Sequence, residues 1–204
     1  AHVVNPHEVL DHYGEDVIRL YEMFMGPFNQ ESVWNTKGIE GVNRFLYKVW
    51  DLFDNSIIVN NIDDETNRIM HKTIKKVTQD IEDFSFNTAI SSMMIFVNHL
   101  HKLKTKPKAS LEILLHILAP FAPHICEELW EQIGESSSIF KDKWPVFNSE
   151  FCKDKEIVMP IQINGKLRDK VIVSSEINEN DLKEKVLAQE KIKVFIGDKK
   201  IVKW

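Results

Sequence analysis

The chain has 204 residues, 43% of them hydrophobic, and a formal net charge of −5 at pH 7, which allows one or two domains with a buried core. No apolar run reaches the ~18 residues that a membrane span requires, and no signal-peptide pattern opens the chain. We therefore expect a cytoplasmic protein without a membrane partner. The two cysteines, Cys126 and Cys152, lack His or Cys neighbours at metal-binding spacing and are expected to be reduced structural thiols.

The charges are distributed unevenly along the chain. Residues 1–156 carry 16 Lys and Arg against 24 Asp and Glu, a net charge of −8, whereas residues 157–204 carry 10 against 7, a net charge of +3. The acidic part is typical of a solvated helical body, and the basic part is suited to a polyanion. A small excess of this size also occurs on domains without a nucleic-acid partner, so it leaves both interpretations open.

Helical patterns dominate the first two thirds of the chain. Asn5 is a suitable N-cap for a first helix with Pro6 at its start, and Gly14 separates this helix from a second one. Apolar residues at spacings of three and four then predict three longer helices, at residues 36–58, 63–84 and 87–103. Asp63 and Asn87 are the predicted caps of the last two.

The segment 107–134 is almost wholly apolar on one side and predicts two helices joined at prolines. Pro120 and Pro123 end the first helix, because proline lacks the amide hydrogen and disfavours a helical residue before it. Pro123 also suits the first turn of the second helix, which carries Trp130 on its apolar face. Such faces need partner helices to cover them, so the sequence predicts a helical assembly.

The hydrophobic period becomes an alternating one in the last quarter of the chain. Isoleucine or methionine occupies every second position from Ile157 to Ile163, and a second alternating run follows the dipeptide Asn164-Gly165. This pattern predicts a β-hairpin. A helix that opens at Asn178 or the next residue and a third strand at residues 199–204 complete the predicted β-β-α-β unit.

Two hairpin registers are compatible with this turn. A plain two-residue loop pairs Ile163 with Lys166 and sets the isoleucines beside basic residues, so that their face cannot be buried. One extra loop or bulge residue pairs Ile163 with Leu167, and the apolar residues of the two strands then lie on the same face. We therefore predict a bulged or three-residue connection, which turns Arg168 and Lys170 to the opposite, solvent-exposed face.

Four stretches of the chain form a recognisable combination. They are DVIRLYEMFMGP, WNTKGIEGVNRFLYKVW, LAPFAPHICEELW and IQINGKLRDKVIV. Together, and in this order, they resemble the C-terminal part of the bacterial-type leucyl-tRNA synthetases, a class I family. The third stretch alone does not separate the leucyl enzymes from the valyl and isoleucyl ones, whereas the first two and the hairpin sequence favour the leucyl branch.

The resemblance implies a mainly α fold in three parts. Residues 1–31 resemble the end of the catalytic module with its helical linker, residues 32–150 an α-helical bundle of the anticodon-binding type, and residues 157–204 a small α+β tRNA-binding domain with a hairpin, a helix and a further strand. The family's nucleotide-binding fold, amino-acid pocket and editing domain have no counterpart here, so the fragment alone is expected to be inactive and to hold no cofactor.

The resemblance also implies the reaction and the partners of the whole enzyme. A leucine-tRNA ligase attaches leucine to tRNA-Leu and uses ATP with Mg. The expected partners of this fragment are therefore tRNA-Leu and the catalytic module of the same chain, and the protein is expected to be a monomer.

RNA binding is the function that the residues themselves support, because tRNA presents phosphates and 2′-hydroxyls that cations and amides recognise. In the last domain the candidate residues are Asn164, Gly165, Lys166, Arg168, Lys170, Lys199 and Lys200. In the bundle they are Lys37, Arg44, Lys48, Lys102, Lys104, Lys106 and Lys108. Lysines near a helix C-terminus also suit the helix dipole, and basic residues on a helix surface are often only solvated.

No catalytic residue or metal ligand is predicted. His99 and His101 lie close together, but no acidic residue at helical spacing accompanies them. Two other interpretations remain open. A helical protein-interaction module with a merely solvated basic tail predicts no salt-dependent tRNA binding, and the equivalent part of a valyl- or isoleucyl-tRNA synthetase would prefer a different tRNA.

Overall fold

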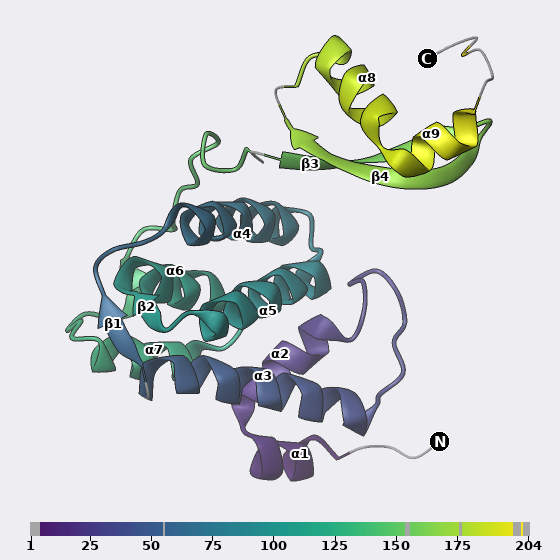
Figure 1. Cartoon of the computed structure of the whole chain (residues 1–204). Coiled ribbons are helices and arrows are strands. Elements are labelled where there is room, and N and C mark those ends of the chain that lie inside the picture. Colours follow the sequence, from purple (N-terminus) through teal and green to yellow (C-terminus); the bar gives the residue numbers. More distant parts are fainter. Residues whose placement is uncertain (1–4, 55, 154–155, 176, 198–200, 202–204) are drawn as a thin grey trace. The chain divides into compact units, whose positions relative to one another are not determined.

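The computed structural model describes residues 5–54, 56–153, 156–175, 177–197 and 201. The chain divides into two compact units, Ala1–Cys152 and Lys153–Trp204, which we call the bundle unit and the hairpin unit (Figure 1). Each is described by itself. The described residues are mainly helical, as predicted, and their strands belong to two small two-stranded sheets.

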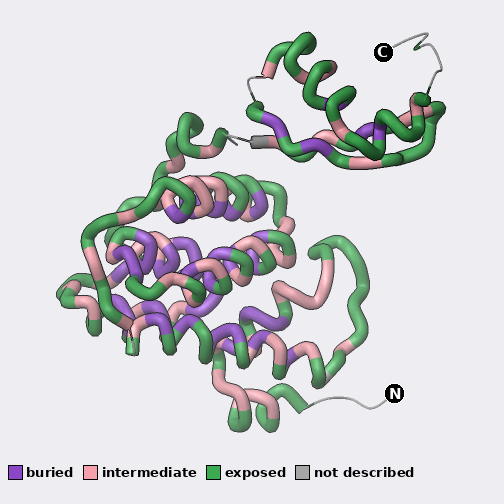
Figure 2. Tube along the Cα trace, viewed as in Figure 1, coloured by how far each residue is buried: buried purple, intermediate pink, exposed green. Residues whose placement is uncertain are grey.

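The bundle unit is built from helices around one core. Its elements are α1 (Pro6–Tyr13), α2 (Glu15–Phe24), α3 (Thr36–Asp54), β1 (Ile57–Val59), α4 (Asp64–Glu82), α5 (Phe86–Lys102), β2 (Thr105–Pro107), α6 (Lys108–Leu118), α7 (Pro123–Gln132) and the 3₁₀ helix η1 (Ile139–Lys141). Helices α2 to α7 all contribute buried apolar side chains to that core, which Figure 2 shows as purple inner faces. On the apolar face of α6, Leu111, Leu114, Leu115 and Leu118 are fully buried.

Two helix caps confirm their predictions. Asn5 Oδ1 accepts a hydrogen bond from the His7 amide at 3.1 Å, and Asp63 Oδ1 accepts one from the Thr66 amide at 2.9 Å. Asp63 Oδ2 also accepts from the Thr66 hydroxyl at 2.6 Å. The Thr66 hydroxyl, followed by the Thr66 amide, lowers the pKa of Asp63, because both donate to the charged carboxylate.

The cap predicted at Asn87 is wrong. Helix α5 begins at Phe86, and Ser85 occupies the cap position. The Ser85 amide donates to the Asp80 carbonyl at 2.7 Å, so the corner closes earlier than the sequence pattern indicated. Phe84 lies between these two residues with a φ of 55°, which is uncommon for a residue with a side chain.

The helix predicted to reach Ile58 ends earlier, at Asp54. Ile57 and Ile58 instead lie in β1, which pairs in parallel with β2. Ile57 lies at helical spacing from the apolar residues of α3, but its side chain is 69% exposed. The spacing therefore did not predict burial. β-branched side chains favour an extended backbone, and this preference decided the segment.

Helices α2 and α3 meet at a tyrosine. The Tyr21 hydroxyl donates to the Asn35 carbonyl at 2.7 Å and accepts from the Asn35 amide at 2.9 Å. The ring lies so close to Gly38 that a Cβ there would be 2.8 Å from Tyr21 Cε2. Gly38, the first of the two glycines in the WNTKGIEG stretch, therefore permits close packing between the first 31 residues and the bundle.

The hairpin unit contains a two-stranded sheet covered by two helices. Its elements are β3 (Glu156–Ile163), β4 (Lys166–Ser174), α8 (Glu179–Ala188) and α9 (Glu190–Ile196). Asn178 caps α8 as expected, accepting from the Asp181 amide at 2.9 Å, whereas α9 was not predicted. The predicted strand at residues 199–204 lies outside the described residues except for Ile201, which is not in a strand.

The register of the hairpin combines features of both alternatives. Ile163 pairs with Lys166 across a two-residue loop, which we had rejected. The predicted bulge is present, but further along: Ile161 pairs with Asp169, and Arg168 has no cross-strand partner. Beyond the bulge, the apolar residues of the two strands again lie on the same face of the hairpin. This common apolar face was the reason for predicting a bulge.

Candidate nucleic-acid interface

The tip of the hairpin has the geometry of a tight turn. Asn164 and Gly165 both have positive φ, at 52° and 75°, as a type I′ turn requires. Both residues are exposed. Their residue types are therefore explained by the backbone of the turn, and the same turn presents them to solvent together with the neighbouring Lys166.

Arg168 stacks on an aromatic ring. Its guanidinium carbon lies 4.5 Å from the centroid of the Phe195 ring, and both side chains are exposed. Phe195 belongs to α9, which covers the apolar face of the sheet through Ile192. The prediction that Arg168 points away from this face is thus wrong, because the extra residue of the bulge turns Arg168 toward the helix side.

Lys170 lies on the uncovered face of the sheet, as predicted. It is exposed and pairs with Pro160. Ile172 follows on the same face, since side chains two positions apart on a strand point the same way. Ile172 and Val158 are 57% and 60% exposed, so this face combines a cation with apolar side chains.

Helix α9 adds residues that the sequence did not reveal. Lys191 and Lys193 are exposed, and Lys191 Nζ lies 3.7 Å from Asp169 Oδ2 on β4. Val194 and Phe195 are 81% and 43% exposed. The alternation of lysines with apolar residues in KIKVFI was the available signal, but it is too short to distinguish a strand from a helix. Lys199 and Lys200 lie outside the described residues.

The candidate residues of the bundle unit are spread over two regions. Lys37, Arg44 and Lys48 are exposed on α3, and Lys48 Nζ donates to Asn98 Oδ1 at 2.9 Å. Lys102 and Lys104 are exposed around the end of α5, whereas Lys108 Nζ lies 3.3 Å from Glu112 and 3.9 Å from Glu135. Lys48 thus contacts α5, whereas the carboxylates of Glu112 and Glu135 partly neutralise the charge of Lys108.

Lys106 differs from the other candidates because its side chain is buried. It is 7% exposed, and its Nζ donates to the Leu103 carbonyl. Burial lowers the pKa of Lys106, and the charge of Asp51 partly opposes this shift. The parallel pairing of β1 with β2 holds Lys106 opposite Ile58. Lys106 is therefore poorly placed to contact a phosphate.

The two clustered histidines have structural partners. His99 Nε2 lies 2.8 Å from the Thr66 hydroxyl, and His101 Nε2 lies 2.9 Å from the Lys48 carbonyl. Within the described ranges, no three His, Cys, Asp or Glu residues come together as metal ligands. No helix in the described part of the chain has both the length and the apolar content needed to cross a bilayer.

Comparisons with known proteins agree with one another. Residues 63–186 match the family model of the anticodon-binding domain of tRNA ligase. The leucine–tRNA ligase of Borrelia garinii subsp. bavariensis is 50% identical over 204 positions, which cover 98% of this chain and 24% of that protein. The leucine–tRNA ligase of Chlorobium phaeobacteroides is 43% identical over 209 positions, covering 100% of this chain and 26% of that protein.

A solved structure resembles the present one. The crystal structure of the LeuRS–tRNA–LeuAMS ternary complex of Agrobacterium radiobacter K84 agnB2 superposes with a TM-score of 0.81 at 32% identity. The match covers 96% of this chain and 28% of that chain. The chain thus spans about a quarter of the length of the curated relatives that it matches.

Proposed function

Because this chain belongs to the anticodon-binding domain family of tRNA ligases, we propose that it is the tRNA-binding portion of a leucine–tRNA ligase. The whole ligase attaches leucine to tRNA-Leu with ATP and Mg, and it acts as a monomer in the cytoplasm. The catalytic and editing residues belong to the rest of the ligase. The present portion holds the tRNA so that its acceptor end reaches the catalytic module.

The observation that carries this proposal is the combination of cations and an aromatic ring at the tip of the hairpin unit. Lys166 and Lys170 extend from β4 into solvent, and Arg168 lies over the ring of Phe195. Lys193 is exposed on the same helix as Phe195. We call these five residues the tip surface, which extends over both faces of the hairpin because Lys170 lies on the face that α9 leaves uncovered.

Each part of the tip surface suits a feature of folded RNA. Lysine side chains bind phosphates as mobile point charges, and this attraction sets position without reading bases. Guanidinium planes and aromatic rings stack on nucleobases that are not covered by a neighbouring base. The stacked Arg168 and Phe195 are held together before RNA arrives, so little side-chain entropy is lost on binding.

Salt dependence is the quantitative expectation. If about four phosphates are neutralised, the logarithm of the association constant should fall with the logarithm of salt concentration at a slope of about −3 to −4. A protein-interaction module with a merely solvated basic surface should show no such dependence. tRNA-Leu should also bind better than tRNA-Val or tRNA-Ile.

The test is a titration of fluorescent tRNA-Leu with the whole chain over a range of salt concentrations. The variant Lys166→Glu with Arg168→Glu should weaken binding and flatten the salt slope. The matched control is Lys141→Glu with Lys143→Glu, which makes the same change of charge on exposed residues of the bundle unit. Equal binding by the tip variant and the native chain would overturn the proposal.

A further inference from the structure

Three phenylalanines from two separate segments gather on one side of the bundle unit. Phe28 follows α2, whereas Phe84 and Phe86 lie at the corner between α4 and α5, beside the loop that follows α2 (Figure 1). The ring centroids are 5.8 Å apart for Phe28 and Phe84, 5.9 Å for Phe28 and Phe86, and 5.7 Å for Phe84 and Phe86. We call them the phenylalanine surface.

Two of the three rings are largely exposed. Phe28 is 73% exposed and Phe84 is 58% exposed. Phe86 is half-buried, and its ring contacts the buried Phe121 at 6.1 Å between centroids. The surface is thus connected to the core through Phe86, while the outer rings remain in water. A cluster of exposed aromatic side chains is typical of an interaction site rather than of an ordinary surface.

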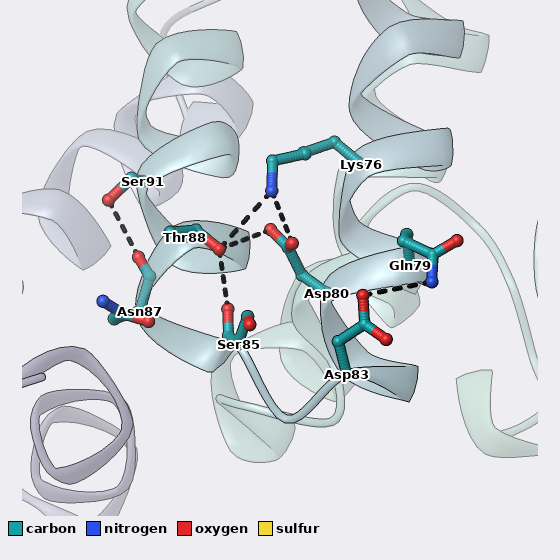
Figure 3. Close-up of polar contacts among 8 residues, drawn as sticks. All are labelled: Lys76, Gln79, Asp80, Asp83, Ser85, Asn87, Thr88 and Ser91. Carbon is teal, nitrogen blue, oxygen red and sulfur yellow. Dashed lines mark hydrogen bonds and ion pairs between the residues drawn. The ribbon is translucent and has the colours of Figure 1, made fainter. Parts of the chain in front are cut away.

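A polar network links the end of α4 to the start of α5 at the corner that carries Phe84 (Figure 3). Asp80 is 4% exposed, and its carboxylate accepts from Lys76 Nζ and from the Thr88 hydroxyl at 2.7 Å. The Asp80 carbonyl accepts from the Ser85 amide. The Phe84 amide also donates to the Ile81 carbonyl at 3.2 Å, so Phe84 occupies the left-handed position of a Schellman cap that ends α4.

The surroundings of the phenylalanine surface are acidic. Glu82 and Asp83 directly precede Phe84 and are exposed. Glu22 lines a hollow of about 170 Å³ together with Phe28 and Phe86. Carboxylates around an apolar centre repel phosphates, so RNA is an unsuitable ligand. The matching partner is a protein surface with apolar side chains at its centre and Lys or Arg at its rim.

We infer that the phenylalanine surface is where another domain of the same ligase docks onto the bundle unit. The relatives that match this chain are about four times its length, so three quarters of such a ligase is available as the partner. This inference rests on the proposed function. It names the residues through which the tRNA-binding portion contacts the remainder of the enzyme. These residues are apolar with acidic neighbours, whereas the tip surface is basic.

The test compares the same residues in two proteins without tRNA. One protein is the 204-residue chain, and the other is a chimera in which it replaces the aligned quarter of the Borrelia garinii ligase. Hydroxyl-radical oxidation of each phenylalanine is followed by mass spectrometry. Oxidation of Phe28 and Phe84 should be severalfold slower in the chimera, whereas Phe140, which is 56% exposed on η1, serves as the reference and should change little.

The other outcomes are decisive as well. Equal oxidation in the two proteins, or protection that appears only when tRNA is added, would overturn the inference. Protection in the isolated chain that grows with its concentration would assign the surface to self-association and also overturn it. Leucylation by the chimera tests the proposed function separately, because docking is measured without tRNA, leucine or ATP.

A substitution at Phe84 separates docking from folding. Phe84→Gly removes the ring and also relieves the positive φ, so the melting temperature of the isolated chain should not fall. In the chimera the same change should increase oxidation of Phe28. The matched control is Ile95→Ala. This substitution truncates another exposed apolar side chain of the bundle unit and should leave Phe28 protected. Unchanged protection of Phe28 in the Phe84→Gly chimera would contradict the inference.

Discussion

Asp16 caps a helix that begins more than 100 residues later, because its Oδ2 accepts a hydrogen bond from the Ile125 amide at 2.7 Å. Its Oδ1 lies 2.9 Å from His124 Nδ1 and accepts from the His124 amide at 3.3 Å. One turn further along α2, Arg19 donates to the Pro120 carbonyl at 3.1 Å. Helix α2 thus satisfies backbone groups on both sides of the proline corner and belongs to the bundle unit.

Removal of the Asp16 carboxylate should destabilise the bundle unit. We expect Asp16→Ala to lower the free energy of unfolding by about 1–2 kcal/mol, the usual effect of losing an N-cap that also faces the helix dipole. Urea unfolding followed by circular dichroism measures this. Glu15→Ala changes an exposed carboxylate at the neighbouring position and serves as the control; an equal loss from both variants would show that the cap contributes nothing.

The buried carboxylate of Asp80 should matter more than its exposed neighbour Asp83. Asp80→Ala leaves the hydroxyl of Thr88 and the amine of Lys76 without this acceptor and should cost about 2–3 kcal/mol. Asp83 accepts from Gln79 Nε2 at 3.1 Å on the surface, so Asp83→Ala should change stability by less than about 0.5 kcal/mol. Similar urea midpoints for the two variants would contradict the role assigned to the network in Figure 3.

Two glycines of α3 should respond in opposite directions to alanine. Gly38→Ala places a methyl group against the Tyr21 ring, which is fixed by Asn35, and should cost about 1–3 kcal/mol. Gly41→Ala meets nothing within 4 Å and should stabilise the chain by up to about 1 kcal/mol through helix propensity. Thermal melting of both variants tests this contrast, and stabilisation by both would show that Tyr21 moves aside.

The stability of the bundle unit should fall in mild acid because of His71. Its Nδ1 accepts from the Asn148 amide at 3.2 Å, its ring stacks on Phe151, and burial lowers its pKa. A lowered folded pKa means that the unfolded chain binds the proton first as pH drops below about 6.5, so stability is present above this pH and is lost below it.

The measurement is the urea midpoint of the native chain and of His71→Gln at about pH 7.5 and about pH 5.5, on either side of the usual histidine pKa. Other groups titrate in both proteins, so their contributions to the stability change cancel in the comparison. The native chain should lose more stability between the two conditions than the variant does. An equal loss in both would show that His71 does not contribute.

Lys106 should be dispensable for RNA binding although it lies among exposed lysines. Lys106→Met removes a cation that already donates to the Leu103 carbonyl, so the affinity for tRNA-Leu and its salt slope should not change. Lys104→Met, two positions away on the surface, tests whether this turn contacts RNA at all, since each lost phosphate contact changes the slope by about 0.7–0.9. A flatter slope for folded Lys106→Met would disprove the assignment.

Much of the local structure followed from the sequence because it depends on residues a few positions apart. The caps at Asn5 and Asp63, the proline corner at Pro120 and the turn at Asn164 were all predicted. The errors occurred where another local preference overrode the apolar spacing. Ile57 and Ile58 form a strand, and the turn at Phe84 lets α5 begin at Phe86, before the predicted cap at Asn87.

What the sequence by itself determined was the family, the mainly helical fold and the positions of its helices, since apolar spacing and capping residues are local properties. Only the tertiary structure decided which charged and aromatic side chains are available at the surface. Burial of Lys106, stacking of Arg168 on Phe195 and the meeting of Phe28 with Phe84 each join segments whose approach is set by packing of the whole core. Packing satisfies all contacts at once, and no single stretch of the chain encodes it.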